Sequence, residues 1–162
     1  MSGIVAVTGG SGFIGSNVVD ALIESGRSVR VIDTVEPHRS DVEWVKDANI
    51  LDVDSLKPAV DGTEAVFHLA AMADVNDIYA NPAHAVALNV QGTVNVLEAG
   101  RLTGAGRTVL ASTVWVYGST VGDVVDGRVL SANGHKLVAN LESAKAQPLL
   151  NPSARVLSDA IS

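Results

Sequence analysis

Thr8-Gly9-Gly10-Ser11-Gly12-Phe13-Ile14-Gly15 is a glycine-rich segment between two apolar ones. The aliphatic residues 3–7 before it predict a short β-strand. After it, the regular spacing of Ile14, Val18 and Leu22 predicts a helix. A strand, a glycine turn and a helix in this order are typical of a dinucleotide site. Glycine turns also join strands to helices where no ligand binds, so the pattern alone leaves both interpretations open.

Three glycines of this segment have separate expected roles. Gly9 allows a tight turn out of the strand, because a positive φ angle is costly for any residue with a Cβ. Gly12 leaves room for a pyrophosphate at the first turn of the helix, and Gly15 lets the helix lie close to the strand. The amides of the helix start, at Phe13 and Ile14, would then hold the phosphate charge together with the helix dipole.

Asp33 ends the next predicted strand, residues 28–32, and lies 18 residues past Gly15. This spacing suits an acid that accepts hydrogen bonds from the adenosine ribose, and Thr34 falls in the same site. A solvated loop acid or a helix cap would look the same in the sequence. A carboxylate here repels a 2′-phosphate, so we expect NAD rather than NADP. Arg30 or Arg39 could weaken that preference without replacing Asp33.

The composition excludes several classes of function. The chain has 162 residues, 47% hydrophobic and 4% aromatic, enough for one aliphatic core. Its net charge of −7 argues against a nucleic-acid surface. There is no cysteine, and the four histidines show no ligand-like spacing, so we predict no metal site. With no membrane-length apolar run and no basic leader, we expect a soluble cytoplasmic protein.

Alternating strand and helix patterns predict an α/β fold with a Rossmann-type, doubly wound parallel sheet. The expected strand order is 3-2-1-4-5, with a ligand crevice between the first and fourth strands. Residues 34–47 are expected to form a loop. The further strands are predicted at 49–51, 65–69 and 108–111, and a short helix at 54–60.

The second long helix is predicted over residues 82–100, because Asn81 can cap it and Pro82 suits its first position. Its expected buried face consists of Val86, Val90, Thr93, Val94 and Leu97. Asp54 is the expected cap of the shorter helix, and Gly26 the left-handed end of the first one.

Together the motifs resemble the NAD-dependent epimerase/dehydratase family, the extended short-chain dehydrogenases/reductases, with UDP-glucose 4-epimerase as the type. The matching pieces, in order, are residues 8–15, Asp33, Leu51-Asp52-Val53, His68-Leu69-Ala70-Ala71, Asn89-Val90-Gln91-Gly92-Thr93 and Ser112-Thr113-Val114-Trp115-Val116-Tyr117-Gly118. They cover about the first 118–125 residues.

The resemblance implies roles for several of these residues. Asp52 and Val53 would contact the adenine, and Ala70 and Ala71, with Leu69 beside them, would line the diphosphate and ribose. Asn89 would be the structural polar residue of the long helix. Thr113 would be the catalytic Ser/Thr that hydrogen-bonds the sugar oxygen being oxidised. The implied chemistry is transient hydride transfer between a nucleotide sugar and NAD. The implied assembly is a homodimer.

The chain departs from the family at its general base, a Tyr followed four residues later by Lys. Tyr79 is followed at that distance by Ala83, and Tyr117 by Val121. We therefore predict that the chain alone is inactive as an enzyme. A non-catalytic NAD-binding module and a fragment stabilised by association are the alternatives.

The resemblance also fades after residue 125. We divide the chain into a Rossmann domain, residues 1–125, and a divergent helical tail, residues 126–162. We expect no substrate domain in this chain and therefore expect it to be truncated relative to its family.

Overall fold

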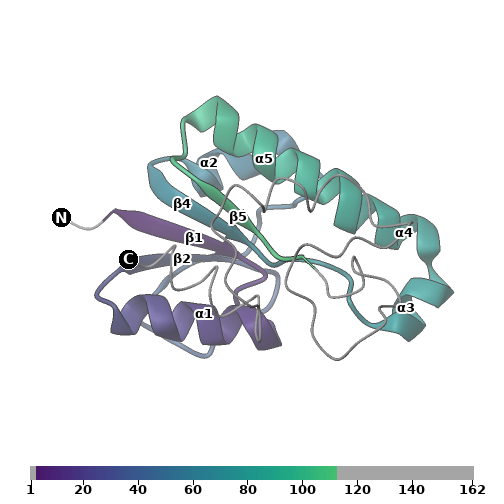
Figure 1. The fold of residues 1–162 in the computed structure, drawn as a ribbon, viewed down its shortest axis with the longest axis horizontal. Helices are drawn as coiled ribbons and strands as arrows, with labels where there is room; N and C mark the ends of the chain where they lie inside the picture. Colours follow the sequence, from purple (N-terminus) through teal and green to yellow (C-terminus); the bar gives the residue numbers. More distant parts are fainter. Residues whose placement is uncertain (1–2, 113–162) are drawn as a thin grey trace, which may run out of the picture. The chain divides into compact units, whose positions relative to one another are not determined.

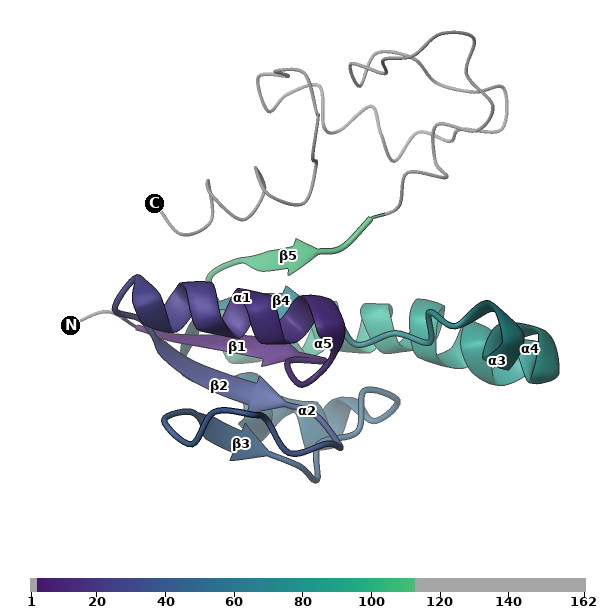
Figure 2. The same cartoon turned by 90° about the horizontal axis from the view of Figure 1, so that it is seen from below.

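The computed structural model describes residues 3–112, which build a parallel β-sheet with helices on both faces. The strands are β1 (Ile4–Thr8), β2 (Ser28–Ile32), β3 (Glu43–Val45), β4 (Thr63–His68) and β5 (Thr108–Leu110). They lie in the order β3-β2-β1-β4-β5, which Figure 2 shows from bottom to top. Every neighbouring pair is parallel. The predicted fold class and the order 3-2-1-4-5 are confirmed.

Helices cover the two faces of the sheet unequally (Figure 1). The helices are α1 (Phe13–Glu24), α2 (Val53–Val60), α3 (Val75–Ala80), α4 (Pro82–Val86) and α5 (Gly92–Thr103), with a π-helical segment, η1 (Ala87–Gln91), between the last two. The α1 helix lies on one face, and α2 and α5 lie on the other. Buried aliphatic side chains from both layers form the core, among them Val18 and Leu22 of α1, Leu56 of α2 and Val96 of α5.

The predicted third strand, residues 49–51, is wrong. The segment forms a turn instead, because the Asn49 side chain accepts a hydrogen bond from the Leu51 amide at 2.9 Å. The strand is Glu43–Val45, inside the predicted loop 34–47, and it pairs with β2 from Arg30 to Ile32. The indole of Trp44 donates to the Asp33 carbonyl oxygen at 2.9 Å, which holds this edge strand in place.

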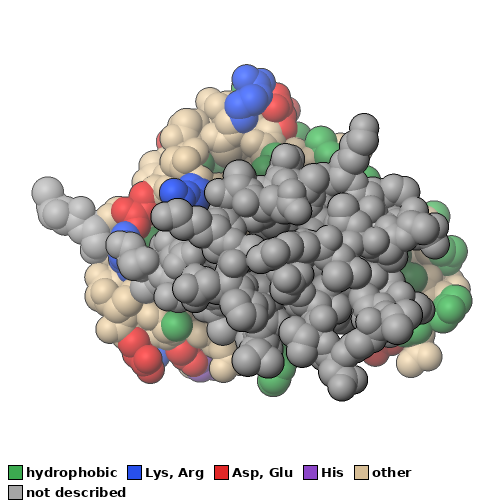
Figure 3. Space-filling view, in the orientation of Figure 1, with side chains coloured by type: hydrophobic (Ala, Val, Ile, Leu, Met, Phe, Trp, Pro, Cys, Tyr) green, Lys and Arg blue, Asp and Glu red, His purple; other side chains and the backbone are tan. Residues whose placement is uncertain are grey.

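The helix predicted at 82–100 exists as the continuous series α4, η1 and α5, and it extends to Thr103. As predicted, the Asn81 side chain caps its start. The predicted buried face is wrong: Val86, Val90, Val94 and Leu97 are all exposed. The buried positions on these helices are Ala85, Gly92, Asn95, Val96, Ala99 and Gly100. Small residues let this face approach its neighbours closely, as where Ile50 packs on Gly92. Figure 3 shows exposed hydrophobic side chains at the end of the molecule that carries α3 and α4.

Two smaller features concern helix ends. The cap of α2 is Asp52 rather than the predicted Asp54, because the Asp52 carboxylate accepts from the Asp54 amide at 2.9 Å. Gly26 has the predicted positive φ, of 81°.

No helix between residues 3 and 112 is long and apolar enough to span a membrane. The predicted boundary at residue 125 and the tail 126–162 lie outside the described residues.

Candidate functional site

The turn between β1 and α1 is shaped by backbone contacts that leave no room for side chains. Gly9 has a φ of 70°, and a Cβ there would come within 2.6 Å of the Ala70 nitrogen. A Cβ on Gly15 would overlap the Gly9 carbonyl oxygen. Gly12 is the N-cap of α1, where no side chain caps the helix and no acid lies in the first turn. The start of α1 therefore keeps unpaired amides and the positive end of its dipole.

Asp33 lies directly beside this turn, as its position after β2 predicts. Its carboxylate accepts from the Ser11 amide at 2.9 Å and from the Val35 amide at 3.0 Å. The Ser11 hydroxyl in turn donates to the Val35 carbonyl oxygen at 2.6 Å. A carboxylate can accept about four hydrogen bonds, so about two remain for a ligand. Thr34, beside it, is exposed.

The end of β4 meets the same turn from the other side. The Leu69 amide donates to the Thr8 carbonyl oxygen at 3.0 Å, and the Ala70 amide to the Thr8 hydroxyl at 3.3 Å. Ala71 is exposed beyond them. The following residue, Met72, is held at both its amide and its carbonyl by the Asn89 side chain, at 2.8 and 2.9 Å. Asn89 sits in η1, and π-helical turns often mark functional positions.

His68 links these pieces and is 5% exposed. Its Nδ1 lies 2.7 Å from the Thr8 hydroxyl, and its Nε2 lies 3.1 Å from the Thr93 hydroxyl. Burial lowers the pKa of His68, so the ring favours its neutral form. The sequence pattern did not reveal the role of Thr8, and it predicted Thr93 on the buried apolar face of the helix. A polar residue ending an aliphatic strand, as Thr8 and His68 both do, is the signal that could have found them.

The Asp52 carboxylate already has a local partner, the Asp54 amide that it caps. Val53 is partly buried and packs against the core. Neither residue makes a hydrogen bond to the glycine turn among those found in the described residues. Their predicted contact with an adenine is therefore untested, and predicted Thr113 lies outside the described residues.

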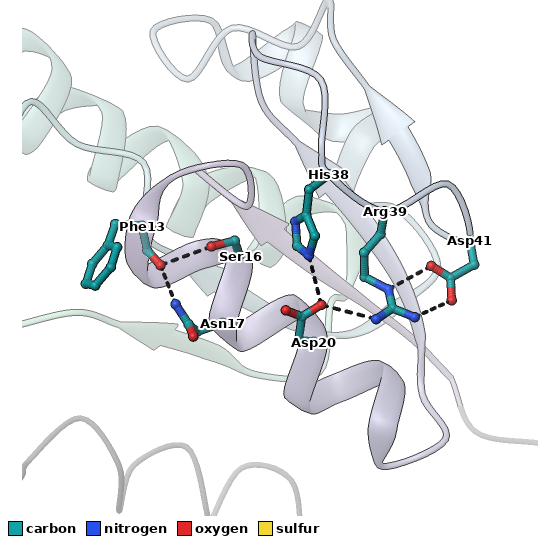
Figure 4. Close-up of polar contacts among 7 residues, drawn as sticks. All are labelled: Phe13, Ser16, Asn17, Asp20, His38, Arg39 and Asp41. Atoms are coloured by element: carbon teal, nitrogen blue, oxygen red, sulfur yellow. Dashed lines mark hydrogen bonds and ion pairs between the residues drawn. The ribbon is translucent and has the colours of Figure 1, made fainter.

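Arg30 and Arg39, the two arginines that could offset the charge of Asp33, are both engaged by protein groups. Arg30 pairs with Glu43, and its Nη1 donates to the carbonyl oxygens of Ala59 and Asp61, both at 3.0 Å. The Arg39 guanidinium donates two hydrogen bonds to the Asp41 carboxylate, at 2.7 and 2.6 Å (Figure 4). It donates a third to Asp20 of α1 at 3.2 Å. The bonds from Arg39 lower the pKa of Asp41, as expected for a charged pair.

The structure thus brings together the glycine turn, Asp33 and the Leu69–Ala70 backbone at the carboxyl ends of β1, β2 and β4. Ligands of open parallel sheets bind at this edge, where the chain reverses its winding direction. Phe13 and Ile14 are exposed at the start of α1, with Phe13 90% exposed. No group of three or more His, Cys, Asp or Glu side chains suited to a metal ion occurs within residues 3–112.

The chain is similar in sequence and in structure to several known proteins. The chain is 40% identical over 119 residues to a 3 beta-hydroxysteroid dehydrogenase/Delta 5-->4-isomerase of Mycobacterium tuberculosis, covering 68% of this chain but only 31% of that relative. It is similar in structure to MoeE5 in complex with UDP-glucose and NAD, with a TM-score of 0.68, 33% identity, and coverage of 82% and 44% of the two chains.

A second solved structure agrees. The UDP-glucose 4-epimerase of Thermus thermophilus, in complex with NAD, matches with a TM-score of 0.60 and 32% identity, covering 68% of this chain and 37% of that one. The chain therefore spans less than half the length of these relatives. The model of the NAD dependent epimerase/dehydratase family matches residues 5–133. This protein belongs to the NAD dependent epimerase/dehydratase family.

Proposed function

We propose that this chain binds NAD at the β1–α1 turn. The observation that carries the proposal is the uncapped start of α1 beside the Asp33 carboxylate, which accepts from Ser11 in the same turn. The amides of residues 13–15 would hold the pyrophosphate, since the Gly12 amide already donates to the Gly9 carbonyl oxygen at 3.1 Å. Gly9 and Gly15 keep the turn free of side chains. Asp33, with Thr34 beside it, would accept from the ribose hydroxyls.

The remaining predicted contacts complete the site. Asp52 and Val53 would meet the adenine. Leu69, Ala70 and Ala71 would lie along the diphosphate and the second ribose. When bound, NAD supplies a hydride acceptor. In this arrangement Thr113 would hydrogen-bond the oxygen of the carbon being oxidised.

The surroundings of Asp33 favour NAD over NADP. The carboxylate would repel a 2′-phosphate, and neither nearby arginine offers an unengaged guanidinium to offset it. Arg39 is shared between Asp41 and Asp20, and Arg30 is bound to Glu43 and to two carbonyl oxygens.

Calorimetric titration with NAD and NADP tests this assignment. Losing hydrogen bonds to a charged carboxylate costs about 1.5–3 kcal/mol, so Asp33→Ala should weaken NAD binding more than tenfold and change NADP binding little. Glu36→Ala is the matched control, because it removes an exposed acid from the same loop. Equal NAD affinity in the wild type and Asp33→Ala, with both folded by circular dichroism, would refute the ribose role.

The substrate class of an intact relative is proposed to be a nucleotide sugar, since MoeE5 was solved with UDP-glucose and the Thermus protein is a UDP-glucose 4-epimerase. The 40% identity to a steroid dehydrogenase favours a steroid as the second candidate. We expect no turnover of either from this chain alone, because it lacks Tyr-x-x-x-Lys. Turnover of UDP-glucose or of a 3β-hydroxysteroid by the pure protein, abolished by Thr113→Val, would overturn this expectation and identify the class.

The proposed assembly is a homodimer through the exposed stripe Val86, Val90, Val94 and Leu97. The side chains recur every three or four residues, so they lie on one face of the helical series and would bury apolar area against a second copy. Light scattering after size exclusion tests this. Val90→Glu should yield a monomer, whereas Leu102→Glu, which charges an exposed position five residues beyond Leu97, should not. A monomeric wild type at micromolar concentration would refute the dimer.

A further inference from the structure

A line of hydrogen bonds runs from the β4 end of the site into the helical series, and His68 is its middle member. It begins at the Ala70 amide, which donates to the Thr8 hydroxyl at 3.3 Å, and continues to His68 Nδ1 at 2.7 Å. From His68 Nε2 it passes to the Thr93 hydroxyl at 3.1 Å and ends at the Asn89 carbonyl oxygen at 2.8 Å. Thr8 has no exposed surface, so its hydroxyl is not in contact with bulk solvent.

The two ends of this line determine where each proton lies. A carbonyl oxygen can only accept, so the Thr93 hydroxyl donates to Asn89 and must accept from His68 Nε2–H. The neutral ring then has no proton on Nδ1, which accepts the Thr8 hydroxyl proton. The Thr8 oxygen is left to accept from the Ala70 amide. Each donor is used once, and only the Nε2–H tautomer of His68 satisfies the whole line.

No neighbouring charge within the described residues would stabilise a protonated ring. The adjacent strands β1 and β5 carry no ionisable side chain. On α5, Glu98 and Arg101 pair with each other, and Glu64 of β4 pairs with Arg27. A second ring proton, on Nδ1, would displace the Thr8 hydroxyl proton and leave it without an acceptor in a buried position.

We propose that His68 is a positioning residue for the cofactor: as the neutral Nε2–H tautomer it orients the Thr8 hydroxyl, which holds the Ala70 backbone against the glycine turn. The identity of the cofactor rests on the proposed NAD site, since Ala70 lies where the second ribose and the diphosphate would bind. The contact is close, because the Ala70 nitrogen lies only 2.6 Å from where a Cβ on Gly9 would be. Release of Ala70 would therefore change the shape of the turn itself.

The first test needs no ligand. In the full-length protein at pH 7.5, the ¹⁵N shifts of the His68 ring should show a protonated Nε2 and an unprotonated Nδ1, and the Ala70 amide should exchange slowly with solvent. His68→Asn keeps an acceptor near the Thr8 hydroxyl and should retain slow exchange at Ala70. His68→Phe keeps the ring volume, removes both nitrogens and should speed that exchange. An Nδ1–H tautomer, or equal exchange in all three proteins, would overturn the proposal.

The second test follows NAD affinity from pH 8 to pH 5. Because burial lowers the pKa of His68 from 6.5, the unfolded ring gains a proton before the folded one, and stability falls as the pH drops below about 6.5. NAD affinity is a property of the folded protein, so in the wild type it should be unchanged near pH 6.5 and fall only at lower pH, where the folded ring itself gains a proton, whereas His68→Asn should lack this component. His68→Phe should bind NAD severalfold more weakly at pH 7.5, up to about tenfold for the loss of one well-placed hydrogen bond. NAD affinity of His68→Phe equal to that of the wild type at pH 7.5 would refute the role of His68. Absence of NAD binding by the wild type would refute only the proposed function, because the ligand-free test stands by itself.

Discussion

The turn between β1 and α1 and the helical series from α4 to α5 both depend on small residues, but they differ in how far the sequence reveals them. In the turn, Gly9 is required by its positive φ angle, and Gly15 is required by the Gly9 carbonyl oxygen, six residues earlier in the chain. In the helical series, two stripes compete for the core, and the more strongly apolar one is exposed.

The difference shows that hydrophobicity alone did not select the buried face. The buried stripe combines Val96 with Ala99, Gly92 and Gly100, whereas the exposed one has four branched aliphatic side chains. Small residues allow close contact, and Ile50 fills the space at Gly92. The branched stripe remains available for the proposed dimer.

The largest effect is expected at the turn. Gly15→Ala places a methyl group on the Gly9 carbonyl oxygen and should lower the free energy of unfolding by about 3 kcal/mol or more. Gly12→Ala is the control, because its Cβ would be 3.3 Å from the same oxygen at an ordinary φ of −74°. Urea denaturation should find Gly12→Ala within about 1 kcal/mol of wild type. Equal decreases in the free energy of unfolding for both variants would mean that the Gly9 carbonyl oxygen does not exclude a methyl group at residue 15.

A smaller effect separates the two stripes of the helical series. Val96 is fully buried, so Val96→Ala should cost about 2 kcal/mol of unfolding free energy. Val94, two residues away, is 52% exposed, and Val94→Ala should stay within about 0.5 kcal/mol. The unfolding free energies of the two variants should be measured at low protein concentration, where a dimer contributes least to stability. If Val94→Ala proved the costlier change there, the assignment of the faces would be reversed.

The smallest effect is expected where the helical series meets the β4 end of the site. Asn89→Ala removes both hydrogen bonds to Met72 and should cost about 1 kcal/mol, because the Met72 backbone is only partly buried and can turn to water. Gln91→Ala is the control, because the Gln91 side chain, on the same segment, donates to Asn95 at 2.8 Å rather than to Met72. Hydrogen exchange at Met72 should rise in Asn89→Ala alone. Unchanged exchange there would show that Asn89 does not hold the loop.

Much of the fold was predictable from local patterns. The strand, turn and helix around Gly9 and Gly15 were correct, as were the strand order and the placement of Asp33 beside the turn. The third strand was not predictable in this way. Asn49 bonds to its own backbone two residues on and turns the chain, while Trp44 reaches the carbonyl of a residue eleven positions earlier.

The sequence by itself determined those features whose cause lies within a few residues: the glycine turn, the first helix, the Asn81 cap and an acid at the end of β2. Tertiary structure alone decided which face of the second long helix is buried, where the edge strand forms, and that His68, Thr8 and Thr93 share one line of hydrogen bonds. The physical reason is that burial and hydrogen-bond partners are properties of groups brought together by the sheet order. His68 and Thr8 are 60 residues apart in the chain, and no periodicity in either strand specifies the other.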